Sequence, residues 1–178
     1  SKLGLATIAA GVVVVAALAL GTRAAQWIAP ARGAAAMPMP QVPAGDSEAT
    51  FAAGCFWSMQ AIFEQLKGVD QVMPGYAGGT APHPTYDQVE TGETGYAETL
   101  DIVYNPKVIS YNQLLDVLLT SRDPTSRNRQ GPDEGTQYRS IIFTRNAAQK
   151  RDALAKIADF NKRHVWPNPI VSTVQPLA

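Results

Sequence analysis

The feature that most limits how this chain can fold is a proline-rich stretch over residues 30–47. It shows no hydrophobic periodicity and consists largely of alanine, glycine, methionine and four prolines: Pro30, Pro38, Pro40 and Pro43. A stretch of this kind forms a semi-extended spacer rather than a packed element. The sequence therefore predicts three parts: an N-terminal segment over residues 1–29, a linker over 30–47 and one folded domain over 48–178.

The N-terminal segment is predicted to interact with a membrane. Residues 3–22 carry no charged side chain and include four consecutive valines at their centre. A helix of this length rises by about 30 Å, the thickness of the hydrocarbon core of a bilayer. We expect an uncleaved anchor, and a cleavable signal peptide is the alternative, because small-residue sites follow at Ala34–Ala36. Both readings predict a membrane-anchored or exported protein, with the bacterial periplasm as its location.

The folded domain alternates between strand and helix signals. Strands are predicted over 49–53, 69–76, 100–104, 140–144 and 170–174, and helices over 56–66, after a cap at Ser110, and over 147–162 after a cap at Asn146. The strand with Leu100, Ile102 and Tyr104 alternates between apolar and other residues, which predicts a half-buried strand. The order of elements predicts an α+β fold with a ferredoxin-like core, in which helices pack on a mixed β-sheet.

Two long loops interrupt this pattern, over residues 77–95 and 122–135. Loops of this length are uncommon in a compact domain unless they build a functional site. We therefore expect their acids, amides and tyrosines to line one.

The overall composition excludes several classes of function. Fifteen basic and fifteen acidic residues give a net charge of zero, which does not suggest a nucleic-acid partner. One cysteine excludes an internal disulfide, and with only two histidines beside it a zinc site is not expected. We expect a monomer.

The single cysteine, Cys55, lies between a predicted strand and the first turn of a predicted helix. Unpaired N–H groups at a helix start favour a thiolate. A helix end contributes only about 0.3–1 kcal/mol to an anion, too little by itself to ionise a thiol at neutral pH. Another group must complete the activation if Cys55 is a nucleophile; the alternative is a buried structural cysteine.

Five sequence blocks around this cysteine occur in a fixed order. They read GCFW over Gly54–Trp57, GYAGG over Gly75–Gly79, PTY over Pro84–Tyr86, TGYAE over Thr94–Glu98 and RNRQGPDEGTQYRS over Arg127–Ser140. One such block would be weak evidence, but the ordered set is highly specific. It resembles peptide methionine sulfoxide reductases of the A type and covers nearly all of residues 48–178.

The resemblance implies a role for four of these residues, two of them catalytic and two substrate-binding. Cys55 matches the nucleophile that attacks the sulfoxide sulfur and becomes a sulfenic acid. Glu98 matches the proton donor to the sulfoxide oxygen, and burial and like charge should raise its pKa. Phe56 and Trp57 match the apolar walls that hold the S-methyl group of the substrate. The alternative for Glu98 is a surface glutamate at a strand edge. The alternative for Phe56 and Trp57 is ordinary core packing.

Three loop residues complete the implied site. Tyr86 and Tyr138 match tyrosines that hydrogen-bond the sulfoxide oxygen, and Asp133 matches a carboxylate that lines the pocket. The alternative for all three is loop packing. The implied substrate is methionine-S-sulfoxide, free or in proteins. No metal or bound cofactor is expected, and the reductant is an external thiol, either thioredoxin or a small thiol.

The chain departs from the family pattern at several places. Tyr96 and Arg122 stand where members commonly carry histidine. There is no second cysteine, and the sequence ends at residues 175–178, where relatives usually continue with a further tail. Two explanations are open: a truncated chain that has lost a resolving cysteine, or a one-cysteine form that an external reductant recycles.

Two other functions compete with repair of oxidised methionine. A non-catalytic or single-turnover domain would bind methionine sulfoxide without being recycled. A generic thiol peroxidase would react with peroxide instead, but it leaves the adjacent pair Phe56–Trp57 without a role.

Overall fold

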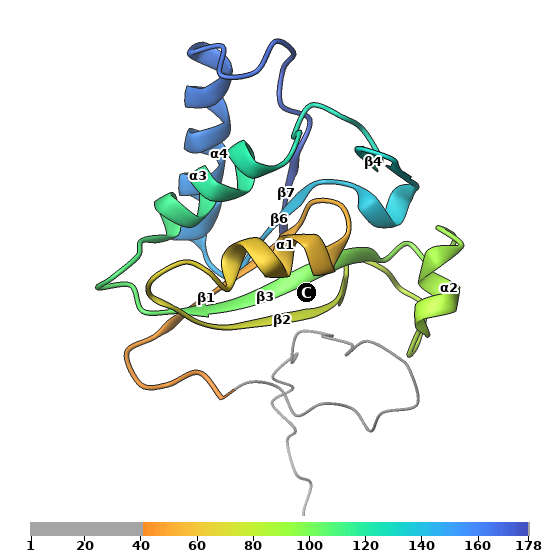
Figure 1. The fold of residues 1–178 in the computed structure, drawn as a ribbon, viewed down its shortest axis with the longest axis horizontal. Helices are drawn as coiled ribbons and strands as arrows, with labels where there is room; N and C mark the ends of the chain where they lie inside the picture. The colour runs from red at the N-terminus through yellow and green to blue at the C-terminus, as the bar shows by residue number, and fades with distance from the viewer. Residues whose placement is uncertain (1–40, 178) are drawn as a thin grey trace, which may run out of the picture.

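The computed structural model describes residues 41–177, which form one five-stranded sheet with helices against it (Figure 1). The strands of the sheet are β1 (Ser47–Ala52), β2 (Val69–Ala77), β3 (Ala97–Tyr104), β6 (Ile141–Thr144) and β7 (Thr173–Pro176). The helices are α1 (Phe56–Phe63), α2 (Tyr86–Glu90), α3 (Tyr111–Ser121) and α4 (Ala147–Lys162). A short hairpin, β4 (Arg129–Gln130) and β5 (Asp133–Glu134), precedes a 3-10 turn, η1 (Thr136–Tyr138).

The sheet has the order β2-β3-β1-β6-β7. Neighbouring strands are antiparallel except β6 and β7, which are parallel, so the sheet is mixed. The first four strands and the two crossover helices α1 and α3 reproduce the ferredoxin-like arrangement, and β7 extends it beyond β6. The predicted α+β fold class is confirmed.

The hydrophobic core lies between the sheet and its three longer helices. Phe51 of β1 contacts Phe63 of α1 and Tyr111 of α3, with ring centroids 5.9 and 6.0 Å apart. The four leucines predicted to form the apolar face of α3 are all buried: Leu114, Leu115, Leu118 and Leu119. Because successive strand residues alternate between faces, every second residue of β1 can contribute to this core.

The helix caps follow the sequence closely. Ser110 forms a capping box with Gln113 at the start of α3, and the Asn146 side chain accepts the Gln149 N–H at the start of α4. Both predicted caps are confirmed, since each satisfies a backbone N–H that has no partner inside its helix.

Four expectations about the elements need correction. Strand β3 is buried along its whole length, not half-buried, because it lies between β2 and β1 and has a second small apolar cluster on the face away from the helices. The last strand is Thr173–Pro176 instead of 170–174, and α1 ends at Phe63 instead of residue 66. Helix α2 falls inside the loop predicted over 77–95.

The functional loops gather at one end of the sheet. Figure 1 shows α2 and the β4 hairpin at the end opposite α3, and the first turn of α1 points toward them. None of the helices between residues 41 and 177 is long and apolar enough to cross a membrane. The predicted membrane segment, residues 3–22, lies outside the described residues.

A buried ion pair joins the turn before α4 to the face of the sheet away from the core. The Asp101 carboxylate on β3 is 1% exposed and accepts hydrogen bonds from Thr50 Oγ1 at 3.0 Å and Arg145 Nη2 at 2.7 Å. Arg145 also forms an ion pair with Glu48 at 3.3 Å. Removing one partner of such a pair leaves an uncompensated charge in a low-dielectric site.

We expect Arg145→Met to lower the free energy of unfolding by about 3 kcal/mol, because Asp101 then stays buried without its cation. Urea unfolding at pH 7 measures the change. Arg163→Met is the matched control, since Arg163 forms a surface ion pair with Asp159 and its loss should cost less than about 1 kcal/mol. Equal effects of the two substitutions would contradict the role given to the buried pair.

Candidate active site

The predicted nucleophile lies on a tight turn between strand β1 and helix α1. Cys55 is the N-cap residue of α1, and its side chain is partly exposed. The preceding residue, Gly54, has φ +85°, a conformation that residues with a side chain rarely adopt. A Cβ atom at Gly54 would also lie 2.6 Å from carbon atoms of Gln130. Both constraints require glycine here, and the turn presents the thiol at the end of the sheet.

The carboxyl group of Glu98 lies directly beside this turn. Phe56 N–H, the first amide of α1, donates a hydrogen bond of 2.8 Å to Glu98 Oε2. Glu98 is 1% exposed, which excludes the alternative of a surface glutamate at a strand edge. The structure therefore brings Cys55 and Glu98 together from segments that are 42 residues apart.

The environment of Glu98 favours its protonated form. Burial raises the pKa of Glu98 to about 8, the Phe56 N–H bond opposes this rise, and the negative charges of Glu90 and Asp133 add to it. The raised pKa that the sequence predicted is confirmed. The like charges come from carboxylates on α2 and β5, whereas the sequence argument named the thiolate. At neutral pH Glu98 can act as an acid.

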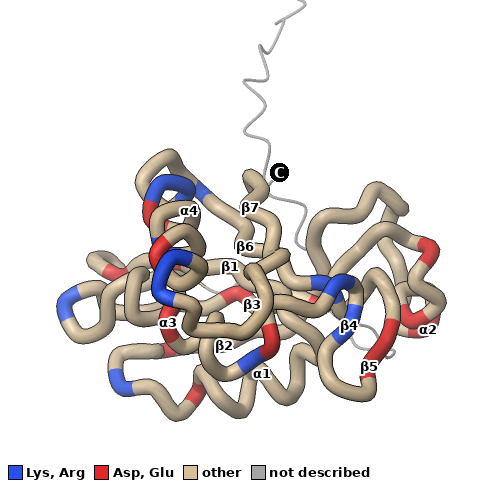
Figure 2. Tube along the Cα trace, turned by 90° about the horizontal axis from the view of Figure 1, so that it is seen from above, with Lys and Arg blue, Asp and Glu red and all other residues tan. Residues whose placement is uncertain are grey.

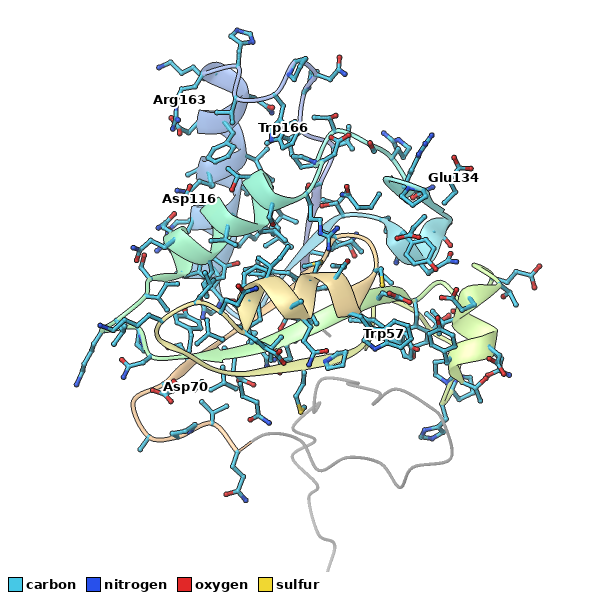
Figure 3. The ribbon with its side chains drawn as sticks, viewed as in Figure 1. Trp57, Asp70, Asp116, Glu134, Arg163 and Trp166 are labelled. Carbon is cyan, nitrogen blue, oxygen red and sulfur yellow. The ribbon has the colours of Figure 1, made fainter. Side chains whose placement is uncertain are left out.

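Two aromatic residues next to Cys55 have different environments. Trp57 is 59% exposed, and its ring stacks on that of Tyr86 with centroids 5.8 Å apart and an interplanar angle of 23°. Figure 3 shows Trp57 between α1 and α2. Phe56 is buried beneath it, 5.3 Å from the Trp57 ring and 5.7 Å from that of Tyr76. Core packing thus accounts for Phe56 but not for Trp57, whose face is open to a ligand.

Tyr138 points toward Glu90, a residue that was not predicted as part of the site. Its hydroxyl donates to Glu90 Oε2 at 2.9 Å, and the Gln137 side chain donates to the Glu90 carbonyl oxygen at 3.0 Å. Glu90 was placed in an unstructured loop, although Thr85-x-x-Gln88 is a capping-box pattern and the structure forms that box at the start of α2. This signal could have identified the helix that carries Glu90.

Arg122 supplies a cation beside the thiol. It follows α3, its guanidinium donates to Ser58 Oγ in the first turn of α1, and its charge interacts with Cys55 and Asp133. Burial lowers the pKa of Arg122, while these two interactions oppose that change. A helix start alone is too weak to activate a thiol, so Arg122 fits the second group that the sequence argument required. Its importance was not predicted.

Asp133 is held at the site by the short β4–β5 hairpin. Figure 2 shows the basic strand β4 beside the acidic strand β5. Arg129 pairs with Glu134 at 3.1 Å across the hairpin, and Gln130 is the register partner of Asp133. Gln130 also exchanges hydrogen bonds with the Asp123 backbone. These hydrogen bonds join the hairpin to the segment after α3. The Gln130 side chain also packs against Gly54.

The two long loops are joined to each other as well. Arg139 donates to the carbonyl oxygens of Gly95 at 2.8 Å and Tyr96 at 3.2 Å, and Thr136 donates to that of Gly92 at 2.6 Å. These bonds hold η1, with Tyr138, against the segment that leads into Glu98. All seven residues predicted for the site lie on the joined segments or on the first turn of α1. Within residues 41–177, no group of three or more His, Cys, Asp or Glu side chains could hold a metal ion.

A partly exposed thiol beside a cation, with a buried protonated carboxyl group next to it, defines a thiol enzyme that combines a nucleophile with an acid. The family model described as "Peptide methionine sulfoxide reductase" matches residues 47–178. The chain belongs to the peptide methionine sulfoxide reductase family, and its relatives are of the A type, as the sequence blocks predicted.

Individual relatives support the same family. The peptide methionine sulfoxide reductase MsrA of Methanosarcina acetivorans is 50% identical over 134 residues, which cover 75% of this chain and 71% of the relative. Among solved structures, methionine sulfoxide reductase A of Corynebacterium diphtheriae has a TM-score of 0.71 at 32% identity and covers 75% of this chain and 66% of its own. Mxr1 from Saccharomyces cerevisiae in reduced form has a TM-score of 0.71 at 33% identity, with coverage of 76% and 78%.

We expect Glu98→Gln to slow the reduction of methionine sulfoxide by about 10²–10³-fold, the range for a positioned general acid. The substitution keeps the size of the side chain and can still accept the Phe56 N–H, but it removes the transferable proton. Steady-state turnover with dithiothreitol measures the loss. Glu93→Gln, on the same loop and exposed, is the control. Unchanged turnover would assign Glu98 a structural role only.

The same substitution should change the stability in a pH-dependent way. Glu98 has a pKa of about 8 in the folded protein against 4.5 as a free side chain, so the folded state keeps a proton that the unfolded state releases between these values. The wild type should lose stability as pH rises through this window, and Glu98→Gln should not. Urea unfolding at pH 5 and 7.5 therefore separates an acid held protonated from an ordinary surface glutamate.

Proposed function

We propose that this chain reduces methionine-S-sulfoxide, free or in proteins, to methionine through a sulfenic acid at Cys55. The observation that carries the proposal is the hydrogen bond from Phe56 N–H to the buried Glu98 carboxyl group, which sets an acid beside the nucleophile. A sulfoxide needs these two groups together, because its sulfur accepts electrons only as its oxygen accepts a proton. The preference for the S epimer rests on the family.

In the proposed reaction the Cys55 sulfur attacks the sulfoxide sulfur while Glu98 gives its proton to the sulfoxide oxygen. The oxygen then passes to Cys55 as both its bond to the substrate sulfur and the bond between the two sulfurs break, so methionine leaves as the thioether. The proton of the original thiol restores Glu98. Two electrons move from the cysteine sulfur to the substrate sulfur, and the sum is sulfoxide plus thiol giving thioether plus sulfenic acid.

Side chains around the thiol suit the two ends of the substrate. The stacked rings of Trp57 and Tyr86 offer an apolar surface for the S-methyl group. The oxygen would lie toward Glu98, within reach of a hydroxyl group such as that of Tyr86 or Tyr138, and Asp133 would line the polar side. Arg122 would place a positive charge beside the attacking sulfur, because its guanidinium interacts with Cys55.

The sulfenic acid must be reduced by a reductant from outside these 178 residues, because they contain no second cysteine. Two equivalents of a thiol regenerate Cys55 and release water and a disulfide. A structure of Mxr1 from Saccharomyces cerevisiae is a complex with Trx2, at 25% identity to this chain and a TM-score of 0.57. We propose a small thiol, or a thioredoxin-like protein that can reach Cys55 directly, as the reductant here.

The experiment that tests the function follows one turnover and then many. Without reductant, the 178-residue chain should release one methionine per chain from methionine sulfoxide, and dimedone should label Cys55. Dithiothreitol should restore repeated turnover. The absence of methionine in both conditions would favour the rival function, a domain that binds oxidised methionine without reducing it. A single turnover that neither dithiothreitol nor thioredoxin can extend would contradict the recycling route but not the nucleophile.

We also propose that residues 3–22 attach the chain to a membrane or direct its export to the bacterial periplasm. The support is the uncharged run of about bilayer length in the sequence. In bacterial cells the full chain should sediment with membranes and be cleaved by protease added to spheroplasts. A chain that lacks residues 1–29 should remain in the supernatant. Recovery of the full chain in the cytosolic fraction, protected from protease, would contradict the proposal.

A further inference from the structure

Glu90 is a second acid at the active site that the reaction above does not use. It is the last residue of α2, and its Oε2 atom accepts the Tyr138 hydroxyl at 2.9 Å. Its other carboxyl oxygen, Oε1, is buried and has no donor among the described residues. A buried acceptor without a donor destabilises the folded state, so a donor is expected close to Oε1.

The explanation is the carboxyl group of Glu98. The side chains of Glu90 and Glu98 lie within hydrogen-bonding reach of each other, and this contact contributes to the raised pKa of Glu98. One oxygen of each carboxyl group is already used, by Tyr138 on Glu90 and by Phe56 N–H on Glu98. Two ionised carboxylates cannot donate to each other, so a bond between them requires a proton on one of the two. The donor that Glu90 Oε1 lacks is therefore a proton on Glu98.

We propose that Glu90 is a positioning residue: its carboxylate accepts the acidic proton of Glu98 and keeps it there until the sulfoxide oxygen takes it. This inference rests on the proposed function. Two acids in contact titrate as a pair, and the first charge makes the second ionisation harder. Tyr138 distinguishes the two acids, because its hydroxyl donates to Glu90 and so uses one oxygen of that carboxyl group as an acceptor.

Other charged and titratable groups face this pair from several elements. Asp133 of β5 adds negative charge beside Glu98, and Asp87 of α2 interacts with the nearby Tyr76. Tyr76 of β2, Tyr86 and Tyr138 contribute hydroxyl groups, and burial first, then the nearby carboxylates, raise the pKa of Tyr76 and Tyr138. Arg122 faces Cys55 and Asp133 on the side of the thiol. The acid pair thus lies on the negative side of the site and the thiol on its positive side.

The substitution that tests the proposal is Glu90→Gln. A glutamine can still accept the Tyr138 hydroxyl, but it is uncharged and can donate to Glu98, which favours the ionised form of Glu98. We measure the rate of methionine release in a single turnover without reductant, from pH 6 to pH 10. The alkaline limb of the profile should move down by about one pH unit, which is about a tenfold slower rate near pH 8.5.

Two further variants make the result specific. Glu90→Asp keeps the charge, so its alkaline limb should stay near that of the wild type even if the shorter side chain lowers the rate overall. Glu93→Gln removes a neighbouring exposed charge and should leave the profile unchanged. A profile of Glu90→Gln that coincides with the wild type, or that falls by the same factor at every pH, would overturn the proposal.

A spectroscopic measurement tests the same proton without any turnover, and so separates failure of this inference from failure of the proposed function. Infrared difference spectra of protein with ¹³C-labelled glutamate report protonated carboxyl groups directly. The wild type should keep one protonated glutamate at pH 7, and its band should disappear at a lower pH in Glu90→Gln. A band that titrates at the same pH in both proteins would overturn the role of Glu90 whether or not the chain reduces methionine sulfoxide.

Discussion

The site depends on the hydrogen bond between the Phe56 amide and the Glu98 carboxyl group. It joins the first turn of α1, which carries the thiol, to β3, a strand that is buried along its whole length. Because both partners belong to regular elements, the separation of nucleophile and acid is set by the sheet and not by mobile loops. Burial raises the pKa of the same carboxyl group, although the bond from Phe56 opposes this rise. The bond therefore sets the position of the acid, and burial sets its protonation state.

Charge around the site is arranged with opposite signs on its two sides. The positive charge of Arg122 lies beside the thiol, and the negative charges of Glu90 and Asp133 favour the neutral form of Glu98. An electrostatic potential of one sign across the whole site would favour the reactive form of only one of the two groups, the thiol or the acid. The loops that carry Glu90 and Asp133 are bound to the rest of the domain by Arg139, Thr136 and Gln130, so these charges have fixed places.

The sequence was informative wherever a pattern had a local cause. The caps at Ser110 and Asn146, the apolar face of α3 and the position of Cys55 at a helix start all follow from neighbouring residues, and all were predicted. The burial of β3 was not, because an alternating pattern does not reveal that Ala97 joins residues of three other strands in an apolar cluster on its second face. Glu90 and Arg122 were missed as parts of the site for a similar reason. Tyr138 is 48 residues from Glu90 in sequence, Cys55 is also far from Arg122, and only the folded chain brings them together.

The place of Cys55 at the end of β1 has a consequence for how this site tolerates change. Strand β1 lies at the centre of the sheet, between β3 and β6, and such strands are among the last parts of a domain to open. The turn that carries the thiol follows β1 directly, so we expect it to open as rarely as the strand does. Trp57, Tyr86 and the acids of α2 and β5 lie on short elements and exposed segments, which open and vary more readily. A lineage can therefore alter which oxidised side chains it accepts while the reactive sulfur keeps its geometry.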